Sequence, residues 1–187
     1  MGFKEIYLLG CDYNLFCQNL NSHCYDDERE KAELPNYNLA FYLKYYSDRD
    51  LYVVTTAKKR DSGDWEEEAS LLGINNLVVD SWNNIRRYGE IRNAFFIFDE
   101  QRVVGSGAWS KYFIRIGRTN EWILLSGTPG DTWMDYIPVF LANRYYKNKT
   151  EFIHMHVEYD RMVKFPKVKR YHNEGILLKL RQEILVP

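Results

Sequence analysis

Two short apolar runs, each ending in polar residues, constrain the fold of this chain more than any other feature. Phe95–Phe98 leads directly into Asp99 and Glu100, and Trp122–Leu125 leads into Ser126. Such runs are too short for helices and are typical of strands buried inside a parallel sheet. In open α/β sheets, sites gather at the carboxyl ends of the strands. We therefore expect these polar residues to lie together at one edge of a sheet.

Strand and helix signals alternate along the rest of the chain. The further expected strands are Ile6–Gly10, Leu51–Thr55 and Leu77–Val79. The expected helices begin at Pro35 and at the capping residues Asp64, Ser81 and Asp131, with a kink at Pro138, and cover about 108–116 and 174–183. This order predicts a single α/β domain over residues 1–187, with three layers and a mainly parallel sheet. We expect the Ile6–Gly10 strand to pair in parallel with the core strands.

Composition narrows the functional classes. A chain of 187 residues with 45% hydrophobic residues is long enough to bury a sizeable core. The formal net charge of −1 gives no general attraction to nucleic acid or to a membrane surface. No apolar run approaches a membrane span, and no signal-peptide pattern begins the chain. Three cysteines cannot form a fully paired disulfide framework, so we expect a cytoplasmic protein.

The Asp99–Glu100 pair has the chemistry of a phosphoryl-transfer site. An aspartate at a strand end can hold Mg²⁺ directly or through water, and a neighbouring glutamate can orient the attacking water. The plainer alternative is an ordinary polar exit from a buried strand. The turn Ser126-Gly127-Thr128-Pro129 after the next strand favours the catalytic interpretation.

These segments resemble the first motor lobe of superfamily-two helicases, and most closely the Swi/Snf-type DEAD/DEAH-box helicases carried by bacteriophages. The resemblance covers about residues 49–187 and implies a RecA-like lobe. It implies that Asp99 is the magnesium ligand, that Glu100 activates water, and that Ser126, Gly127 and Thr128 couple nucleotide state to nucleic-acid binding. The implied contacts to DNA or RNA come from Thr55, Lys58, Lys59, Arg60, Ser81 and Trp82. Gln101 and Arg102 depart from the Ala-Asp/His common after the acidic pair.

The phosphate-binding part of that family has no counterpart here. A motor lobe uses a glycine-rich loop and its lysine to hold the β- and γ-phosphates. Here the first strand leads into Cys11 and Asp12, and no glycine follows Gly10 until Gly63. The second motor lobe, which supplies the arginine finger, has no counterpart in these residues either. We therefore expect Mg²⁺ with ATP to bind weakly or not at all, and the isolated chain not to be a competent ATPase.

Residues 1–47 resemble a different family, the bacterial polysaccharide glycosyltransferases related to sialyltransferases. The resemblance rests on the run from Gly2 to Tyr13 and on His23-Cys24-Tyr25-Asp26. It implies that Asp12 and His23 are site residues near a sugar nucleotide. The two resemblances together imply a lineage junction near residues 47–50. The first segment supplies strand, loop and helix, so it can occupy the place of the missing phosphate-loop unit and complete the sheet.

Other clusters have plainer interpretations. Cys11, Cys17, His23 and Cys24 lack the close pairing of zinc ligands, so no zinc is expected. His154 and His156 would diverge on a helix, which favours surface or partly packed positions. The basic and aromatic run 161–172 is interpreted as a solvated linker rather than a nucleic-acid contact, and Lys58–Arg60 is the better placed basic cluster.

Three functions are therefore compatible with the sequence. The first is a helicase-like lobe that keeps the Mg²⁺ and water carboxylates and contacts nucleic acid. The second is a non-catalytic module that binds nucleic acid or a protein. The third is a glycosyltransferase-derived protein that uses Asp12 and His23.

Overall fold

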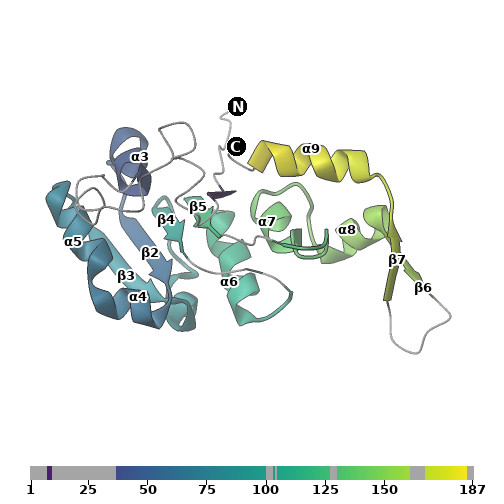
Figure 1. The fold of residues 1–187 in the computed structure, drawn as a ribbon, viewed down its shortest axis with the longest axis horizontal. Helices are drawn as coiled ribbons and strands as arrows, with labels where there is room; N and C mark the ends of the chain where they lie inside the picture. Colours follow the sequence, from purple (N-terminus) through teal and green to yellow (C-terminus); the bar gives the residue numbers. More distant parts are fainter. Residues whose placement is uncertain are drawn as a thin grey trace, which may run out of the picture.

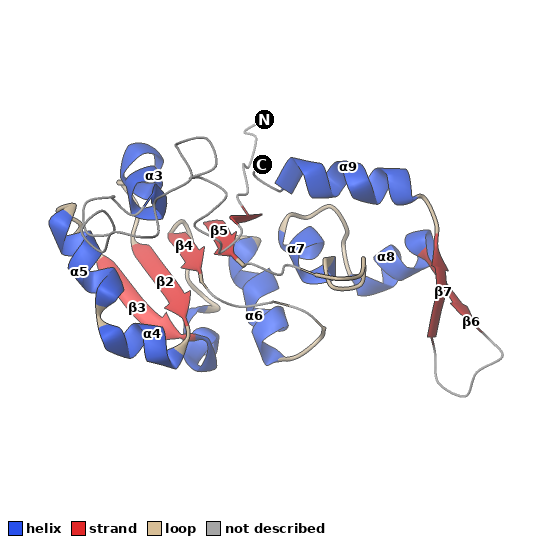
Figure 2. Ribbon diagram, in the orientation of Figure 1, coloured by secondary structure: helices blue, strands red, loops and turns tan. Residues whose placement is uncertain are grey.

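The protein is built around a five-stranded parallel sheet. The structure is a computed structural model that describes residues 8–9, 37–99, 103, 105–126, 130–160 and 167–184. The strands lie in the order β1 (Leu8–Leu9), β5 (Glu121–Leu125), β4 (Phe95–Phe98), β2 (Leu51–Thr55) and β3 (Leu77–Ser81). Every neighbouring pair is parallel. The predicted α/β class and parallel sheet are therefore confirmed (Figures 1 and 2).

The central strand β4 divides its residues between two hydrophobic clusters. All four of its residues are buried. Phe95 and Ile97 belong to one cluster, and Phe96 and Phe98 belong to the other. Successive side chains of a strand point to opposite faces of the sheet, so this division means that both faces are covered. A strand that is apolar at every position can only be stable in such a place.

Helices cover both faces of the sheet. On one face, α3 (Tyr37–Tyr45) and α5 (Asp64–Leu71) contribute Leu39, Tyr42 and Trp65. On the other face, η1 (Trp82–Tyr88), α6 (Ala108–Gly117) and α7 (Ile137–Ala142) pack against Phe96 and Phe98. The sheet thus lies between two layers of helices.

The N-terminal strand joins one edge of the sheet. Leu8 pairs with Leu124 and Leu9 pairs with Leu125, both in parallel register. The expectation that this strand pairs with the core is confirmed for these two residues. The rest of the expected Ile6–Gly10 strand lies outside the described residues.

The C-terminal part extends away from the sheet. It comprises α8 (Lys149–His156), the antiparallel pair β6 (Val157–Asp160) and β7 (Lys167–Tyr171), and α9 (Glu174–Ile184). The β6–β7 pair lies at the opposite end of the molecule from β3 (Figure 1). Leu177 and Ile184 of α9 belong to the same core cluster as α7, which attaches this part to the sheet.

Two helix starts differ from the sequence prediction, whereas the start after Ser81 is as predicted. Gly63, with φ of 76°, caps α5, and Asp64 is its first residue. Ser81 precedes a 3₁₀ helix and makes no side-chain capping bond. Pro138 stands in the first turn of α7, which begins at Ile137 rather than near Asp131. The kink prediction was wrong because a proline in the first turn removes an N–H that has no helical partner there.

Several elements were not predicted at all. They are α4 (Ala57–Ser62), α8 and the β6–β7 pair. None of the helices in the described part of the chain is both long and apolar enough to cross a membrane.

Candidate functional site at the carboxyl edge of the sheet

The sheet topology marks one place where a site is expected. From β2 the chain passes α4 and α5 on one face to reach β3, whereas from β4 it passes α6 on the other face to reach β5. β2 and β4 are neighbours, so their following connections diverge in opposite directions. Such a topological switch point leaves a crevice beyond the carboxyl ends of the strands, where ligands of open α/β sheets bind. We call the edge formed by Thr55, Ser81, Phe98 and Leu125 the carboxyl edge.

Asp99 lies at this switch point and is only 5% exposed. Its Oδ2 accepts hydrogen bonds from the Thr55 hydroxyl at 2.9 Å and from the Trp65 indole at 3.3 Å. The Trp82 indole donates to the Asp99 carbonyl at 3.0 Å, and the Asp99 N–H donates to the Val54 carbonyl at 2.8 Å. Groups from β2, α5 and η1 therefore fix both the backbone and the carboxylate of Asp99.

The predicted nucleic-acid residues Thr55, Ser81 and Trp82 are all buried. The Thr55 hydroxyl and the Trp82 indole are directed to Asp99. In this arrangement the two side chains orient the carboxylate and its backbone. Trp65 was not among the predicted site residues, and it proves to be a direct partner of Asp99.

A second buried carboxylate, Asp80, lies near the end of β3, which β2 separates from β4, and the sequence analysis missed it. It accepts hydrogen bonds of 2.7 Å from the Ser81 N–H, the Asn84 amide and the Tyr88 hydroxyl. Burial alone would raise the pKa of Asp80, but the hydrogen bonds from Asn84, Tyr88 and Ser81 outweigh it, so the pKa lies below its usual value. Burial of Tyr88 and its hydrogen bond to Asp80 raise the pKa of Tyr88. The signal was available, because Leu-Val-Val-Asp has the pattern of an apolar strand ending in an acid.

The basic cluster Lys58, Lys59 and Arg60 also lies at the carboxyl edge, on α4. The helix begins after Thr56, whose hydroxyl accepts from the Lys59 N–H at 3.2 Å. The hydrogen bond to Asp64, 2.6 Å long, raises the pKa of Lys59 against the opposing effect of burial, and the charge of Asp99 adds to the rise.

Arg60 and Lys58 differ from Lys59 in their surroundings. Arg60 contacts Asp61 at 2.7 Å and Asp80 at 3.6 Å. Arg87 of η1 lies 3.8 Å from the same Asp80 carboxylate. Lys58 is exposed. Two of the three predicted cations therefore already lie beside carboxylates of the chain.

The remaining predicted residues divide between one that is described and several that are not. Ser126 is buried at the end of β5, on the same edge as Asp99. Glu100, Gln101, Arg102, Gly127 and Thr128 lie outside the described residues, as do Asp12 and His23. The predicted junction at residues 47–50 falls between α3 and β2.

Asp99 has the chemistry of a magnesium ligand. Mg²⁺ commonly takes one or two carboxylates from a protein and keeps several waters, and ligand carboxylates are usually oriented by hydrogen bonds. Asp99 offers a single carboxylate oriented by Thr55 and Trp65. Within the described ranges, no group of three or more metal-ligating side chains occurs. Among the described residues at this position, Asp99 would hold the ion, and water and a ligand's own oxygens could complete its coordination.

The C-terminal basic run is partly neutralised where the structure describes it. Lys169 and Arg170 of β7 contact Glu158 at 3.1 and 2.6 Å. Hydrogen bonds from Lys169 and Arg170 lower the pKa of Glu158 to about 2. Residues 161–166 lie outside the described residues.

The two histidines of α8 diverge, but the predicted surface or partly packed position is wrong for His156, because its ring nitrogens have partners inside the protein. His154 is exposed, whereas His156 is fully buried between the Tyr146 hydroxyl, 2.8 Å away, and the His172 carbonyl, 3.0 Å away.

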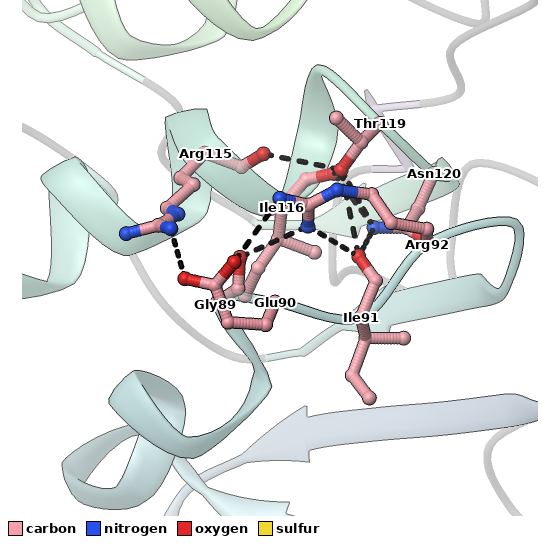
Figure 3. A network of polar contacts seen from close by, with 8 residues as sticks. All are labelled: Gly89, Glu90, Ile91, Arg92, Arg115, Ile116, Thr119 and Asn120. Atoms are coloured by element: carbon pink, nitrogen blue, oxygen red, sulfur yellow. Dashed lines mark hydrogen bonds and ion pairs between the residues drawn. The ribbon is translucent and has the colours of Figure 1, made fainter.

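The opposite edge of the sheet lies at Leu51, Leu77, Phe95 and Glu121, and we call it the amino edge. A network of polar contacts lies there, just before β4 and β5 (Figure 3). The Asn120 side chain accepts from the Ala94 N–H at 2.9 Å and donates to the carbonyls of Ile91 and Ile116, both at 2.9 Å. Arg92 donates to the Ile91 carbonyl at 2.8 Å, and Arg115 pairs with Glu90. These bonds tie the loops before β4 and β5 together.

The amino edge also carries a hollow of about 350 Å³, well separated from Asp99 along the strands. It is lined by Tyr42, Leu43, Ser47, Gly73, Ile74, Asn75 and Asn76. Asn76 and Tyr42 hydrogen-bond each other and the Arg49 carbonyl, so these two lining residues are engaged within the protein.

Comparison with known proteins gives no independent assignment. No family model matches this chain, and no curated protein matches it.

Proposed function

We propose that this chain is a RecA-like motor lobe of the superfamily-two helicase type, which binds nucleic acid at its carboxyl edge and does not hydrolyse ATP by itself. One observation carries the proposal. Asp99 is a buried carboxylate at the topological switch point of a parallel sheet, oriented by Thr55 and Trp65. Burying a charged group is costly, so a buried carboxylate at the carboxyl ends of parallel strands is a candidate functional group.

The arrangement of neighbouring strands supports the same proposal. β5, which Ser126 directly follows, lies between β4 and β1. The carboxyl ends of these three parallel strands therefore share one edge with Asp99. The resemblance requires an acidic strand, a Ser-Gly-Thr strand and a first strand that jointly form the nucleotide side of the lobe. When bound, Mg²⁺ would neutralise phosphate charge there, and Asp99 would hold the ion while Thr55 keeps the carboxylate in place.

Nucleic-acid binding is the direct test. The variant with Lys58, Lys59 and Arg60 all changed to alanine is compared with the parent, using fluorescence anisotropy of labelled single-stranded DNA, duplex DNA and RNA. We expect weak, sequence-independent binding that falls with salt. Each phosphate contact adds roughly 0.7–0.9 to the slope of log affinity against log salt, so the variant should bind more weakly and with a smaller slope.

The variant with Lys167, Lys169 and Arg170 all changed to alanine is the matched control. As in the first triple, two of the three cations that it removes lie beside a carboxylate, here Glu158. A greater effect of this control than of the first triple would move the contact to the C-terminal basic run. Absence of binding at low salt, or binding that neither triple weakens, would reject the nucleic-acid role and leave a silent interaction module in its place.

ATP turnover provides the second test. Because the chain has no glycine-rich loop with its lysine, we expect no ATP hydrolysis above background, with or without nucleic acid. Turnover that disappears in Glu100→Gln would show instead that the acidic pair is catalytically competent.

A further inference from the structure

Trp109 is an exposed tryptophan beside the candidate site, and the functional residues described above do not include it. Of the five tryptophans, all of which the structure describes, Trp109 has the largest exposed fraction, 38%. Trp65, Trp82 and Trp122 are buried. A partly exposed indole next to a candidate site suggests a binding role, because burying a large aromatic side chain gives more favourable free energy than burying a small one.

Trp109 lies at the carboxyl edge and packs against Trp82. It stands in the first turn of α6, which follows β4 and begins at the carboxyl edge, at the same end as the arrowheads of β2 and β3 in Figure 1. Its ring centroid is 6.1 Å from that of Trp82, at an interplanar angle of 41°. Trp82 in turn packs on Phe98 and donates to the Asp99 carbonyl. Trp109 therefore packs against a buried tryptophan that is itself part of the core.

The space around the start of α6 is open. Gly105 and Gly107 precede Trp109, and a Cβ built on either glycine meets no atom within 4 Å. Ser106 between them is exposed. The indole and the residues just before it are therefore exposed among the described residues.

The surroundings favour a ligand that is both aromatic and anionic. Arg86 and Arg87 are exposed on η1, the short helix that also carries Trp82. The other large exposed apolar side chains of the described part belong to other elements: Tyr45, Leu71, Val78, Met155, Ile176 and Leu178. Arginines on η1, the helix whose Trp82 packs against Trp109, suit a flat aromatic group attached to phosphate.

We propose that Trp109 is a stacking platform for a nucleobase at the carboxyl edge. This inference rests on the proposed function and adds the residue that contacts the base. Stacking of a base on an aromatic side chain is tolerant of sequence, because every base has a π-face. Trp109 would hold a base while the nearby cations attract the phosphates.

The experiment measures how strongly a short labelled oligo-dT strand and a strand of the same length with abasic sites bind to the parent and to Trp109→Ala. Loss of one base–aromatic stack should weaken oligo-dT binding about tenfold. Binding of the abasic strand should not change, and neither should the salt dependence. Trp109→Phe should retain most of the affinity, which separates loss of stacking from loss of folding.

Tyr45→Ala is the matched control, because Tyr45 is 56% exposed at the end of α3, on the amino edge. It should leave binding of both strands unchanged. Quenching of tryptophan fluorescence by AMP that is lost in Trp109→Ala would identify a free nucleotide as a source of the base. Quenching by oligo-dT alone would identify the strand.

Two results overturn the inference in distinguishable ways. If oligo-dT binds the parent and Trp109→Ala equally, while the Lys58, Lys59 and Arg60 variant binds more weakly, the proposed function stands and the stacking role is wrong. If neither strand nor AMP binds the parent at low salt, the proposed function and the stacking role fail together.

Discussion

The two edges of the central sheet differ in the kind of polar side chain that they bury. At the amino edge, the buried polar side chain is a neutral amide, Asn120, whose donors and acceptor all have partners in adjoining loops. At the carboxyl edge, the buried polar side chains include two carboxylates, Asp80 and Asp99. A neutral amide satisfies backbone groups at little cost, whereas a buried charge requires compensation.

The difference indicates which edge serves stability and which serves binding. The Asn120 side chain connects the Ala94 N–H to the Ile91 carbonyl, and its removal would leave the Ala94 N–H unpaired. The partners of Asp99 orient a carboxylate, and a hydrophobic core needs no carboxylate there. Natural proteins commonly accept reduced stability at functional sites. We therefore assign stability to the amino edge and binding to the carboxyl edge.

The largest expected effect on stability is at the amino edge. Asn120→Ala leaves the Ala94 N–H without its partner and removes one donor to the Ile91 carbonyl, which keeps its bond from Arg92. A buried group left unpaired costs about 1–3 kcal/mol, so the free energy of unfolding should fall by about 1–3 kcal/mol in urea denaturation. Asn75→Ala is the control, because Asn75 is exposed and should change stability by less than about 0.5 kcal/mol. Equal stability of the two variants would remove the structural role of Asn120.

A smaller effect is expected where a side chain only orients the site. Thr55→Val removes the hydroxyl that donates to Asp99 and leaves the Trp65 indole as its donor. The free energy of unfolding should fall by about 1 kcal/mol, less than for Asn120→Ala. Thr55→Ser, which keeps the hydroxyl, should behave like the parent. A loss from Thr55→Val as large as that from Asn120→Ala would mean that both edges carry stability equally.

The smallest effect concerns acid and Asp80. Its pKa is lowered in the folded protein, so its ionised form contributes stability that is complete above the unfolded pKa of about 3.9 and is lost as pH falls through the lower folded value. The difference in unfolding free energy between the parent and Asp80→Asn should therefore shrink as pH falls below about 4. Thermal melts of both proteins at neutral and acid pH measure it. A difference that stays constant would show that ionised Asp80 gives no such stability.

The sequence predicted those elements whose patterns are local and strong. The β-branched or aromatic runs at Leu51–Thr55 and Phe95–Phe98 ended where polar residues began, as expected for buried parallel strands. Helix α8 was missed because only Phe152 and His156 of it are buried. Its start nevertheless has a recognisable signal, since Asn148 accepts from the N–H of Glu151, three residues later.

The candidate site was predicted in part. Asp99 was identified because it follows a strand, and its place on a shared edge followed from parallel pairing. The Thr55–Asp99 hydrogen bond joins residues 44 positions apart. It depends on β2 lying beside β4, and no local pattern specifies strand order. Trp109 has no motif of its own, and its significance arises only from exposure and from contact with Trp82.

The most direct test of the central claim is the free energy of unfolding of Asp99→Asn at neutral pH. The amide oxygen of the variant can still accept from Thr55 and Trp65, while the buried charge is gone. If the carboxylate is retained for binding, the variant should be as stable as the parent or more stable. A loss of about 3 kcal/mol or more, the size expected when a buried charged network is broken, would contradict the account and make Asp99 a structural residue.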